Sequence, residues 1–118
     1  MSQHNETGKK GEQLAAQYLR QSGYTILHCN WRHSRYEIDI IATHSNILHF
    51  IEVKTRTTNS FGMPEESVST QKLRHLLKAG AAFQYRYPQY TRVQYDVLSI
   101  SYKPEGQTEY FLIEDVYL

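Results

Sequence analysis

Two acidic residues and a lysine lie in apolar segments with the spacing of a metal-dependent hydrolytic site. Glu52 and Lys54 are two residues apart in a segment, 50–54, that has the composition of a strand with a charged end. Side chains alternate along a strand, so Glu52 and Lys54 are predicted to share one face. Asp39 interrupts the apolar run 38–41. Asp is disfavoured inside strands, and burying it unpaired is costly, so Asp39 needs a partner.

A hairpin would bring these side chains together. With strands at 36–42 and 47–55 and a turn at 43–46, Asp39 lies level with residues 50–52. Asp39 and Glu52 could then hold one hard cation, Mg²⁺ or Mn²⁺, with the main-chain carbonyl of Val53 as a further ligand. Lys54 would lie beside a water on that cation, to orient it, to deprotonate it or to stabilise negative charge in the transition state.

A third carboxylate comes from the first predicted helix, residues 9–21. Its apolar stripe is formed by Leu14, Ala15, Tyr18 and Leu19, and Glu12 lies at the edge of that stripe. Glu12 can therefore lean over whatever the helix packs on, and it could complete the cation's shell through water. The alternative for Asp39, Glu52 and Lys54 is a salt-bridge ladder on an exposed strand face.

The elements that would position this site make up an α/β domain. Besides the helix and the hairpin, the sequence predicts an edge strand at 24–29, a loop at 30–35 and a second loop at 61–67. A second helix is predicted from about Thr70 to Tyr85 with Ser69 as its cap, followed by strands at 93–101 and 109–113. The expected fold is a mixed sheet flanked by helices. Residues 1–7 are expected to be a loose tail and residues 8–118 a single domain.

Composition narrows the class of protein. The chain has 118 residues, of which 40% are apolar and 21% charged, as in ordinary globular domains. No apolar stretch approaches the roughly 20 residues of a membrane span, and the polar start has no signal-peptide core, so a cytoplasmic protein is expected. The single cysteine, Cys29, excludes an internal disulfide and is expected to be buried.

Charge is distributed unevenly along the chain. The net charge is +1, but residues 1–92 carry a balance of +5 and residues 93–118 a balance of −4. This polarity suits a polyanionic partner, although a mixed solvated surface explains it equally well. The candidate phosphate contacts are Arg32, Arg35, Arg56 and Lys72.

Two other features have a functional and a structural interpretation. Glu37, on the same predicted face as Asp39, could bind a second metal or a basic side chain, but a solvated carboxylate at the strand end is favoured. Trp31 and the segment 85–92, which interleaves Tyr and Arg, could stack on unpaired bases, but packing against the domain is favoured.

Motifs along almost the whole chain resemble those of the YraN-type family of small bacterial proteins. They are Gly8-Lys9, Gly11-Glu12, Ala15, Tyr18-Leu19, Gly23-Tyr24, Ile26-Leu27, Asn30-Trp31-Arg32, Glu37-Ile38-Asp39-Ile40-Ile41-Ala42, Phe50-Ile51-Glu52-Val53-Lys54, Arg56, Phe61-Gly62 and Lys72. The resemblance implies the restriction-endonuclease-like, or PD-(D/E)xK, fold and a similarity to archaeal Holliday-junction resolvases. In those proteins a helix Glu, a strand Asp and a Glu-x-Lys do the chemistry, and the matching positions are Glu12, Asp39, Glu52 and Lys54.

The resemblance leads to three functional hypotheses. The first is a Mg²⁺- or Mn²⁺-dependent nuclease acting on nucleic acid, DNA before RNA, with a symmetric dimer as in the resolvases. The second is a module of the same fold that binds nucleic acid without cutting it. It is suggested by the low net charge and by Tyr36, which stands where the family usually has Gly. The third, with the least support, is a protein-interaction domain, suggested only by the 10 Tyr residues.

Overall fold

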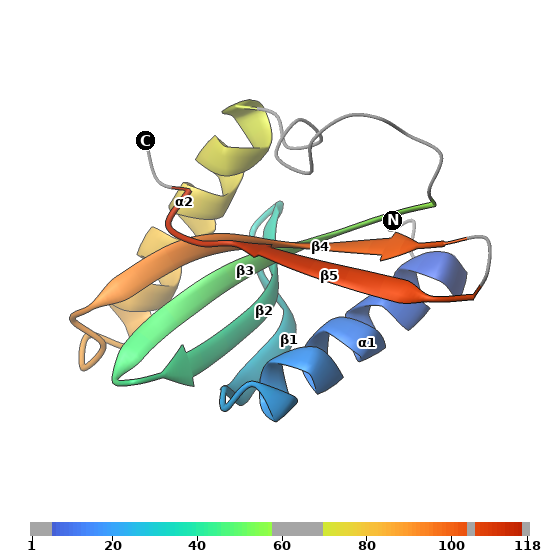
Figure 1. Cartoon of the computed structure of the whole chain (residues 1–118). Helices are drawn as coiled ribbons and strands as arrows, with labels where there is room; N and C mark the ends of the chain where they lie inside the picture. The colour runs from blue at the N-terminus through green and yellow to red at the C-terminus, as the bar shows by residue number, and fades with distance from the viewer. Residues whose placement is uncertain (1–5, 58–69, 104–105, 117–118) are drawn as a thin grey trace.

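The computed structural model describes residues 6–57, 70–103 and 106–116, and these form a mixed sheet with a helix on each face (Figure 1). In chain order the elements are α1 (Glu6–Gln21), β1 (Thr25–His33), β2 (Tyr36–His44), β3 (Ile47–Thr57), α2 (Thr70–Arg86), β4 (Val93–Tyr102) and β5 (Thr108–Ile113). The strands lie side by side in the order of the chain. In that sheet β3 and β4 run parallel and the other neighbouring pairs run antiparallel. The predicted α/β domain is confirmed.

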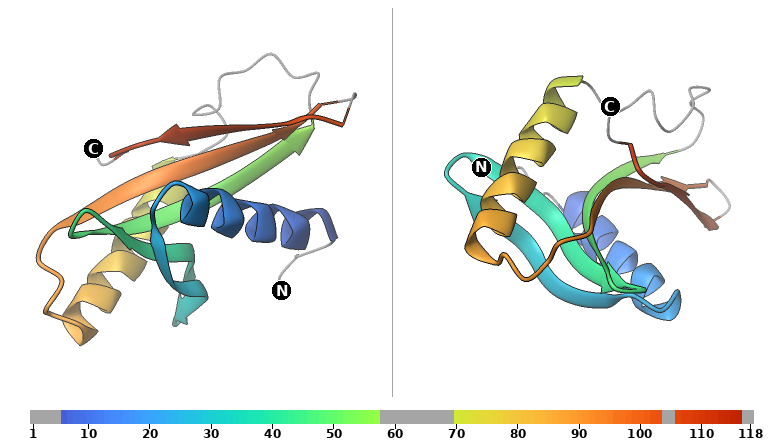
Figure 2. Two further views of the ribbon diagram at one scale, coloured as in Figure 1. Left: turned by 60° about the horizontal axis from the view of Figure 1, so that its bottom comes forward. Right: turned by 90° about the vertical axis from the view of Figure 1, so that its left-hand side faces the viewer.

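The two helices cover opposite faces of the sheet, as the two views in Figure 2 show. On one face α1 buries Ala15 and Leu19 against Ile40 and Ile51. On the other face α2 packs against a separate cluster around Phe50. The link between the parallel strands β3 and β4 contains α2, which is the usual way to join parallel neighbours.

Helix α1 ends where the sequence predicts. Gly23 has a φ of 97°, in the left-handed region where glycine has no Cβ penalty. The Gly23 amide donates to the Arg20 carbonyl at 3.0 Å, and the Tyr24 amide donates to the Leu19 carbonyl at 2.9 Å. This pair of bonds is a Schellman motif, which satisfies the last carbonyls of the helix. The helix begins at Glu6, three residues before the predicted start.

Strand β1 corrects the prediction for residues 30–35. The predicted loop is largely strand, because β1 continues to His33 and only the turn around Ser34 and Arg35 lies between β1 and β2. Trp31 pairs with Ile38 of β2, and its ring meets the Phe83 ring edge-on at 5.2 Å between centroids. Pairing with β2 and contact with α2 outweigh the polar composition of the segment. The interpretation of Trp31 as a packing residue is confirmed.

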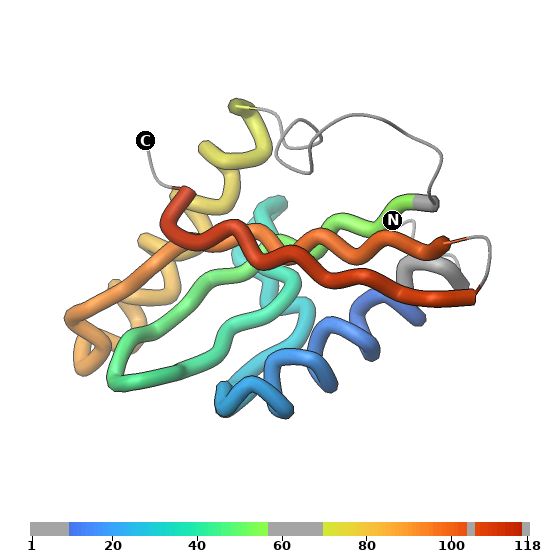
Figure 3. Tube along the Cα trace, in the orientation of Figure 1, coloured from blue at the N-terminus to red at the C-terminus, as the bar shows by residue number. Residues whose placement is uncertain are grey.

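Strands β2 and β3 form the predicted hairpin, with longer strands and a tighter turn (Figure 3). The turn contains Ser45 and Asn46, whose φ angles of 53° and 66° are those of a type I′ turn. Ile40 pairs with Ile51, which sets Asp39 level with Glu52. The predicted alignment of these two carboxylates is confirmed.

Several smaller predictions have mixed outcomes. The 61–67 loop, the Ser69 cap and residues 1–5 of the predicted tail lie outside the described residues. Cys29 is exposed, so the expectation of a buried thiol is wrong. Its position on β1, the first strand of the sheet order, leaves it uncovered. None of the helices in the described part of the chain is long and apolar enough to cross a membrane.

Candidate metal and nucleic-acid site

The backbone of β2 changes course at Asp39. Ile38 and Ile41 both pack in the α2 cluster, whereas Ile40 packs in the α1 cluster. Strict alternation would put Ile38 and Ile40 on the same face, so the strand is irregular between them. At this level the Asp39 carboxylate, through Oδ2, accepts a hydrogen bond from the Val53 amide at 2.8 Å. In a regular ladder the Val53 amide would donate to a main-chain carbonyl of β2, but here it donates to the Asp39 side chain.

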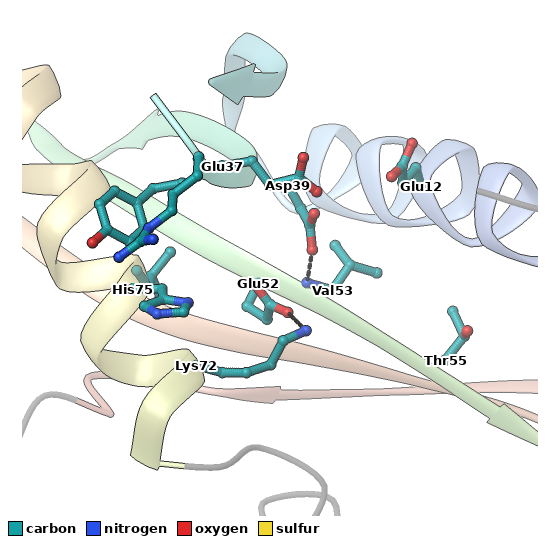
Figure 4. Close-up of a pocket in the computed structure, with 11 residues that line it drawn as sticks. Glu12, Glu37, Asp39, Glu52, Val53, Thr55, Lys72 and His75 are labelled. Carbon is teal, nitrogen blue, oxygen red and sulfur yellow. Dashed lines mark hydrogen bonds and ion pairs between the residues drawn. The ribbon is translucent and has the colours of Figure 1, made fainter. Parts of the chain in front are cut away.

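A polar cavity of about 300 Å³ opens at this irregularity, between α1, β2, β3 and α2. Figure 4 shows Asp39 between Glu37 and Glu12, with Glu52 and Lys72 on the side of α2. The lining residues are Glu12, Arg35, Tyr36, Glu37, Asp39, Glu52, Val53, Thr55, Lys72, His75 and Leu76. Four carboxylates from three elements therefore share one opening with three basic side chains.

Asp39 is the most strongly perturbed of these acids. Burial raises its pKa from 3.8 to about 8, and the neighbouring carboxylates of Glu52, Glu12 and Glu37 add to the rise. The hydrogen bond from the Val53 amide acts in the opposite direction. Without a cation, burial therefore favours the protonated form of this carboxyl group. A perturbed acid in a cleft is a common mark of a functional site.

Glu52 and Lys54 share a face of β3, as alternation predicts. Lys72 Nζ lies 3.0 Å from Glu52 Oε2, with the Glu52 side chain 13% exposed and the Lys72 side chain 50% exposed. Burial, and then the nearby Lys72 ammonium, lowers the pKa of Lys54. Lys54 is not among the residues that line the cavity itself. Its ammonium lies close enough to Lys72 and Glu52 for both side chains to affect its pKa.

Glu12 arrives over the cavity from α1, as predicted, and two contacts set its position. A Cβ on the preceding residue, Gly11, would overlap Cγ2 of Thr55, so α1 approaches β3 closely here. On the other side, Asn30 Nδ2 donates to Glu12 Oε1 at 3.1 Å. Sequence reasoning missed Asn30 and Thr55. Asn30 belongs to one of the family motifs, which could have marked it as a site residue. It was missed because residues 30–35 were predicted to be a loop.

The four predicted phosphate contacts occupy different places. Lys72 and Arg35 line the cavity, and the Arg35 guanidinium lies 5.5 Å from the centre of the Tyr36 ring. Arg32 forms an ion pair with Glu37 at 3.1 Å, so Glu37 has a basic partner and is not a simply solvated carboxylate. Arg56 is half-buried near the end of β3. That these side chains bind phosphates stays a prediction.

The donor set suits a hard cation that keeps part of its water. Among the described residues, no three His, Cys, Asp or Glu side chains converge as a ready-made cluster. Asp39 holds the Val53 amide with Oδ2, which leaves Oδ1 for another ligand. The Leu48 amide donates toward β4, to the Arg92 carbonyl. The Val53 amide points the other way, toward β2, and the carbonyl of the same residue shares that direction. Two carboxylates and a carbonyl fit Mg²⁺ or Mn²⁺ better than a closed structural zinc site.

The segment that carries these residues matches a known family. Residues 11–100 match the profile of the uncharacterised protein family UPF0102, and this range includes Glu12, Asp39, Glu52 and Lys54. The chain belongs to the UPF0102 family. The YraN-type resemblance of the sequence motifs is thereby confirmed at the level of the family.

Relatives within the UPF0102 family are of similar length. A UPF0102 protein of Bacteroides thetaiotaomicron is 39% identical over 100 residues, which cover 85% of this chain and 83% of the relative. A UPF0102 protein of Phocaeicola vulgatus is 38% identical over 116 residues, which cover 98% of this chain and 93% of the relative. A UPF0102 protein of Christiangramia forsetii is 39% identical over 117 residues, which cover 99% of this chain and 98% of the relative. The likeness therefore extends over the whole domain.

Proposed function

We propose that this protein is a metal-dependent nuclease of the restriction-endonuclease-like type, acting on nucleic-acid phosphodiesters. The observation that carries the proposal is the placement of Asp39 level with Glu52 across the β2–β3 hairpin, at a cavity that Glu12 overhangs. A helix Glu, a strand Asp and a Glu-x-Lys follow one another along the chain, which is the order expected from the resemblance to PD-(D/E)xK proteins. DNA is the favoured substrate, and a symmetric dimer follows from the similarity to resolvases.

Each side chain has a distinct role in this proposal. Asp39, Glu52 and the Val53 carbonyl would hold Mg²⁺ or Mn²⁺, and Glu12 would act through water. When bound, the cation lowers the pKa of water and neutralises charge on the phosphate. Lys54 holds its ammonium beside Glu52 and stabilises negative charge that develops on the phosphate oxygens. The raised pKa of Asp39 means that the cation competes with a proton there, so its binding strengthens as the pH rises toward 8.

Basic side chains at the rim would position the substrate backbone. Lys72 and Arg35 line the cavity, on α2 and in the β1–β2 turn. Phosphate contacts of this kind fix the register of a nucleic acid without reading its sequence. Because the contacts are ionic, binding should weaken steeply as salt concentration rises.

Cleavage of a panel of substrates tests the proposal. The wild type and Asp39→Asn would be incubated with branched, flapped, single-stranded and duplex DNA and with RNA, in Mg²⁺ or Mn²⁺. Asparagine keeps an oxygen that can accept the Val53 hydrogen bond but lacks the charge that holds a cation. Cation-dependent cleavage by the wild type alone is expected. If the two proteins cleave equally, or if neither cleaves, the proposal that this site is a nuclease active site is rejected.

A second candidate is a nucleic-acid-binding module that does not cut. Two observations favour it: Glu52 is engaged by Lys72, and Tyr36 occupies the strand entry, with Arg35 and Lys78 near its ring. This candidate requires salt-sensitive binding that survives both Asp39→Ala and Glu52→Ala. Nucleic-acid affinity that does not change across a salt titration would reject it.

A further inference from the structure

The hydrogen bond between Asn30 and Glu12 joins two elements that are far apart in sequence at the rim of the cavity. Asn30 Nδ2 donates to Glu12 Oε1 at 3.1 Å, from β1 to α1. Asn30 has a φ of 56°, in the left-handed region that strands normally avoid. Asn adopts this region more readily than most residues because its short amide can bond locally. Here the amide instead bonds to a carboxylate of the candidate site.

The position of Asn30 in the sheet explains why its side chain reaches Glu12. In the β1–β2 register, Cys29 pairs with Ile40 and Trp31 pairs with Ile38. Asn30 therefore lies opposite Asp39, at the same level where β2 is irregular. Both strands depart from regular geometry at this level, and each turns a polar side chain toward the site.

Close packing limits the movement of α1 on the other side. Gly11 allows the helix to touch Thr55 of β3, where a Cβ would overlap Thr55 Cγ2 and lie 3.5 Å from the Tyr102 hydroxyl. The contact fixes how deeply the helix sits, but it does not fix where the long Glu12 side chain points. The hydrogen bond from Asn30 restricts that remaining freedom.

We propose that Asn30 is a positioning residue that holds the Glu12 carboxylate at the cavity and thereby sets the affinity for a divalent cation. The proposal rests on the proposed metal site. Removing a hydrogen-bond partner that orients a directly ligating side chain typically changes metal affinity by about 10- to 100-fold, and Glu12 would act one step further away, through water. Because the bond is solvent-accessible, the lower end of that range is expected for Asn30.

The chain offers a matched pair of substitutions for the test. Asn30→Gly removes the amide and tolerates the left-handed backbone. Asn46→Gly makes the same chemical change at a φ of 66°, in the β2–β3 turn and outside the cavity lining. Mn²⁺ affinity would be measured on the full chain by electron paramagnetic resonance of the free ion. Asn30→Gly is expected to raise the dissociation constant about tenfold, and Asn46→Gly to leave it within twofold.

A double substitution separates positioning through Glu12 from a general structural effect. If Asn30 acts through Glu12, Asn30→Gly has no further effect on the Mn²⁺ dissociation constant in a Glu12→Ala background. An equal loss in both backgrounds, or no loss in the wild-type background, overturns the proposal. If the wild type itself binds no Mn²⁺, it is the proposed function that fails.

Folding is checked independently by circular dichroism and thermal unfolding without metal. If Asn30→Gly does not fold, Asn30→Ser replaces it. Serine is accommodated in the left-handed region elsewhere in this protein, at Ser34 with a φ of 59° and Ser45 with a φ of 53°. Its hydroxyl is too short to reproduce the bond to Glu12, so the same tenfold weakening is expected. Unchanged Mn²⁺ affinity in a folded Asn30→Ser variant contradicts the proposal.

Discussion

The Asp39 carboxylate accepts the Val53 amide hydrogen bond at 2.8 Å, where the β2–β3 ladder would otherwise continue. This single contact explains how a carboxylate is retained inside an apolar hairpin. It satisfies one oxygen of Asp39 and supplies a backbone donor with a partner, and the other oxygen stays available to a ligand in the cavity that Asp39 lines. Burial still raises the pKa of this carboxyl group, against the effect of the hydrogen bond, and that shift leads to the first prediction.

Asp39 should make the metal-free protein less stable as pH rises. The folded-state pKa is about 8 and the unfolded value 3.8, so between about pH 4 and pH 8 the folded state binds more protons. The free energy of unfolding therefore falls through this window and levels off above it. At about 1.4 kcal/mol for each unit of pKa shift, the loss is up to about 6 kcal/mol. Urea unfolding at pH 5 and pH 8.5, with a chelator present, measures it.

The matched variant for this effect is Asp39→Asn, which has no proton to lose. Its unfolding free energy should change little between the two pH values, and at pH 8.5 it should exceed that of the wild type. Identical pH profiles for the two proteins would show that Asp39 does not carry the effect.

Lys72 should contribute to nucleic-acid binding through its charge at the cavity. Lys72→Ala removes one phosphate contact, so we expect weaker binding and a salt-dependence slope shallower by about 1. Fluorescence anisotropy with a labelled oligonucleotide over a salt titration measures both. Arg86→Ala, at the exposed end of the same helix, is the control and should change neither. Equal slopes for Lys72→Ala and the wild type would remove Lys72 from the interface.

The sequence predicts those parts of the site that depend on neighbouring residues along the chain, and it does not predict the parts that depend on contacts between distant elements. The hairpin level of Asp39 and Glu52 follows from strand alternation and turn length, and it is confirmed. The irregular passage of β1 through Asn30 does not follow, because it depends on pairing with β2 and on the contact between Trp31 and Phe83 of α2. Such contacts between distant elements have no periodic signature in the chain.

A second buried aspartate shows why an acid in a strand is an incomplete signal. Asp96 lies in β4 and is fully buried, as sequence reasoning did not anticipate. Its oxygens accept from Gln94 Nε2 at 3.0 Å and from the Asp115 amide at 2.9 Å, and its Oδ2 lies 2.7 Å from His49 Nδ1. Asp39 and Asp96 have the same local pattern. The difference lies in their surroundings, because Asp39 lines a cavity whereas Asp96 bonds to His49, Gln94 and the Asp115 amide.

Asp96 should therefore matter for stability. Asp96→Ala leaves the buried His49 ring and the part-buried Asp115 amide without the oxygens to which they bond, so we expect a loss of about 3 kcal/mol in unfolding free energy. Chemical denaturation measures it. Glu109→Ala is the control, because Glu109 is exposed and its ion pair with Lys103 is a surface contact that should contribute less than about 1 kcal/mol. A loss of similar size in both variants would contradict a specific role for the Asp96 network.

The contact between Gly11 and Thr55 should set the depth of α1 above the site. In Gly11→Ala the new methyl group overlaps Thr55 Cγ2, a branched side chain with little rotational freedom, so the helix must shift. Overpacking of this kind typically costs about 1–3 kcal/mol, and thermal unfolding should detect it. Because Glu12 follows Gly11 directly, the shift should also weaken Mn²⁺ binding.

Removing the opposing methyl group provides the decisive comparison. Thr55→Ser deletes Cγ2 and keeps the hydroxyl, so the double variant Gly11→Ala with Thr55→Ser should recover most of the lost stability and Mn²⁺ affinity. Thr55→Ser alone leaves a small void and should cost about 1 kcal/mol or less. If the double variant is as unstable as the sum of the two single variants, the clash lies elsewhere. If its stability returns but its Mn²⁺ affinity does not, the depth of α1 does not control Glu12.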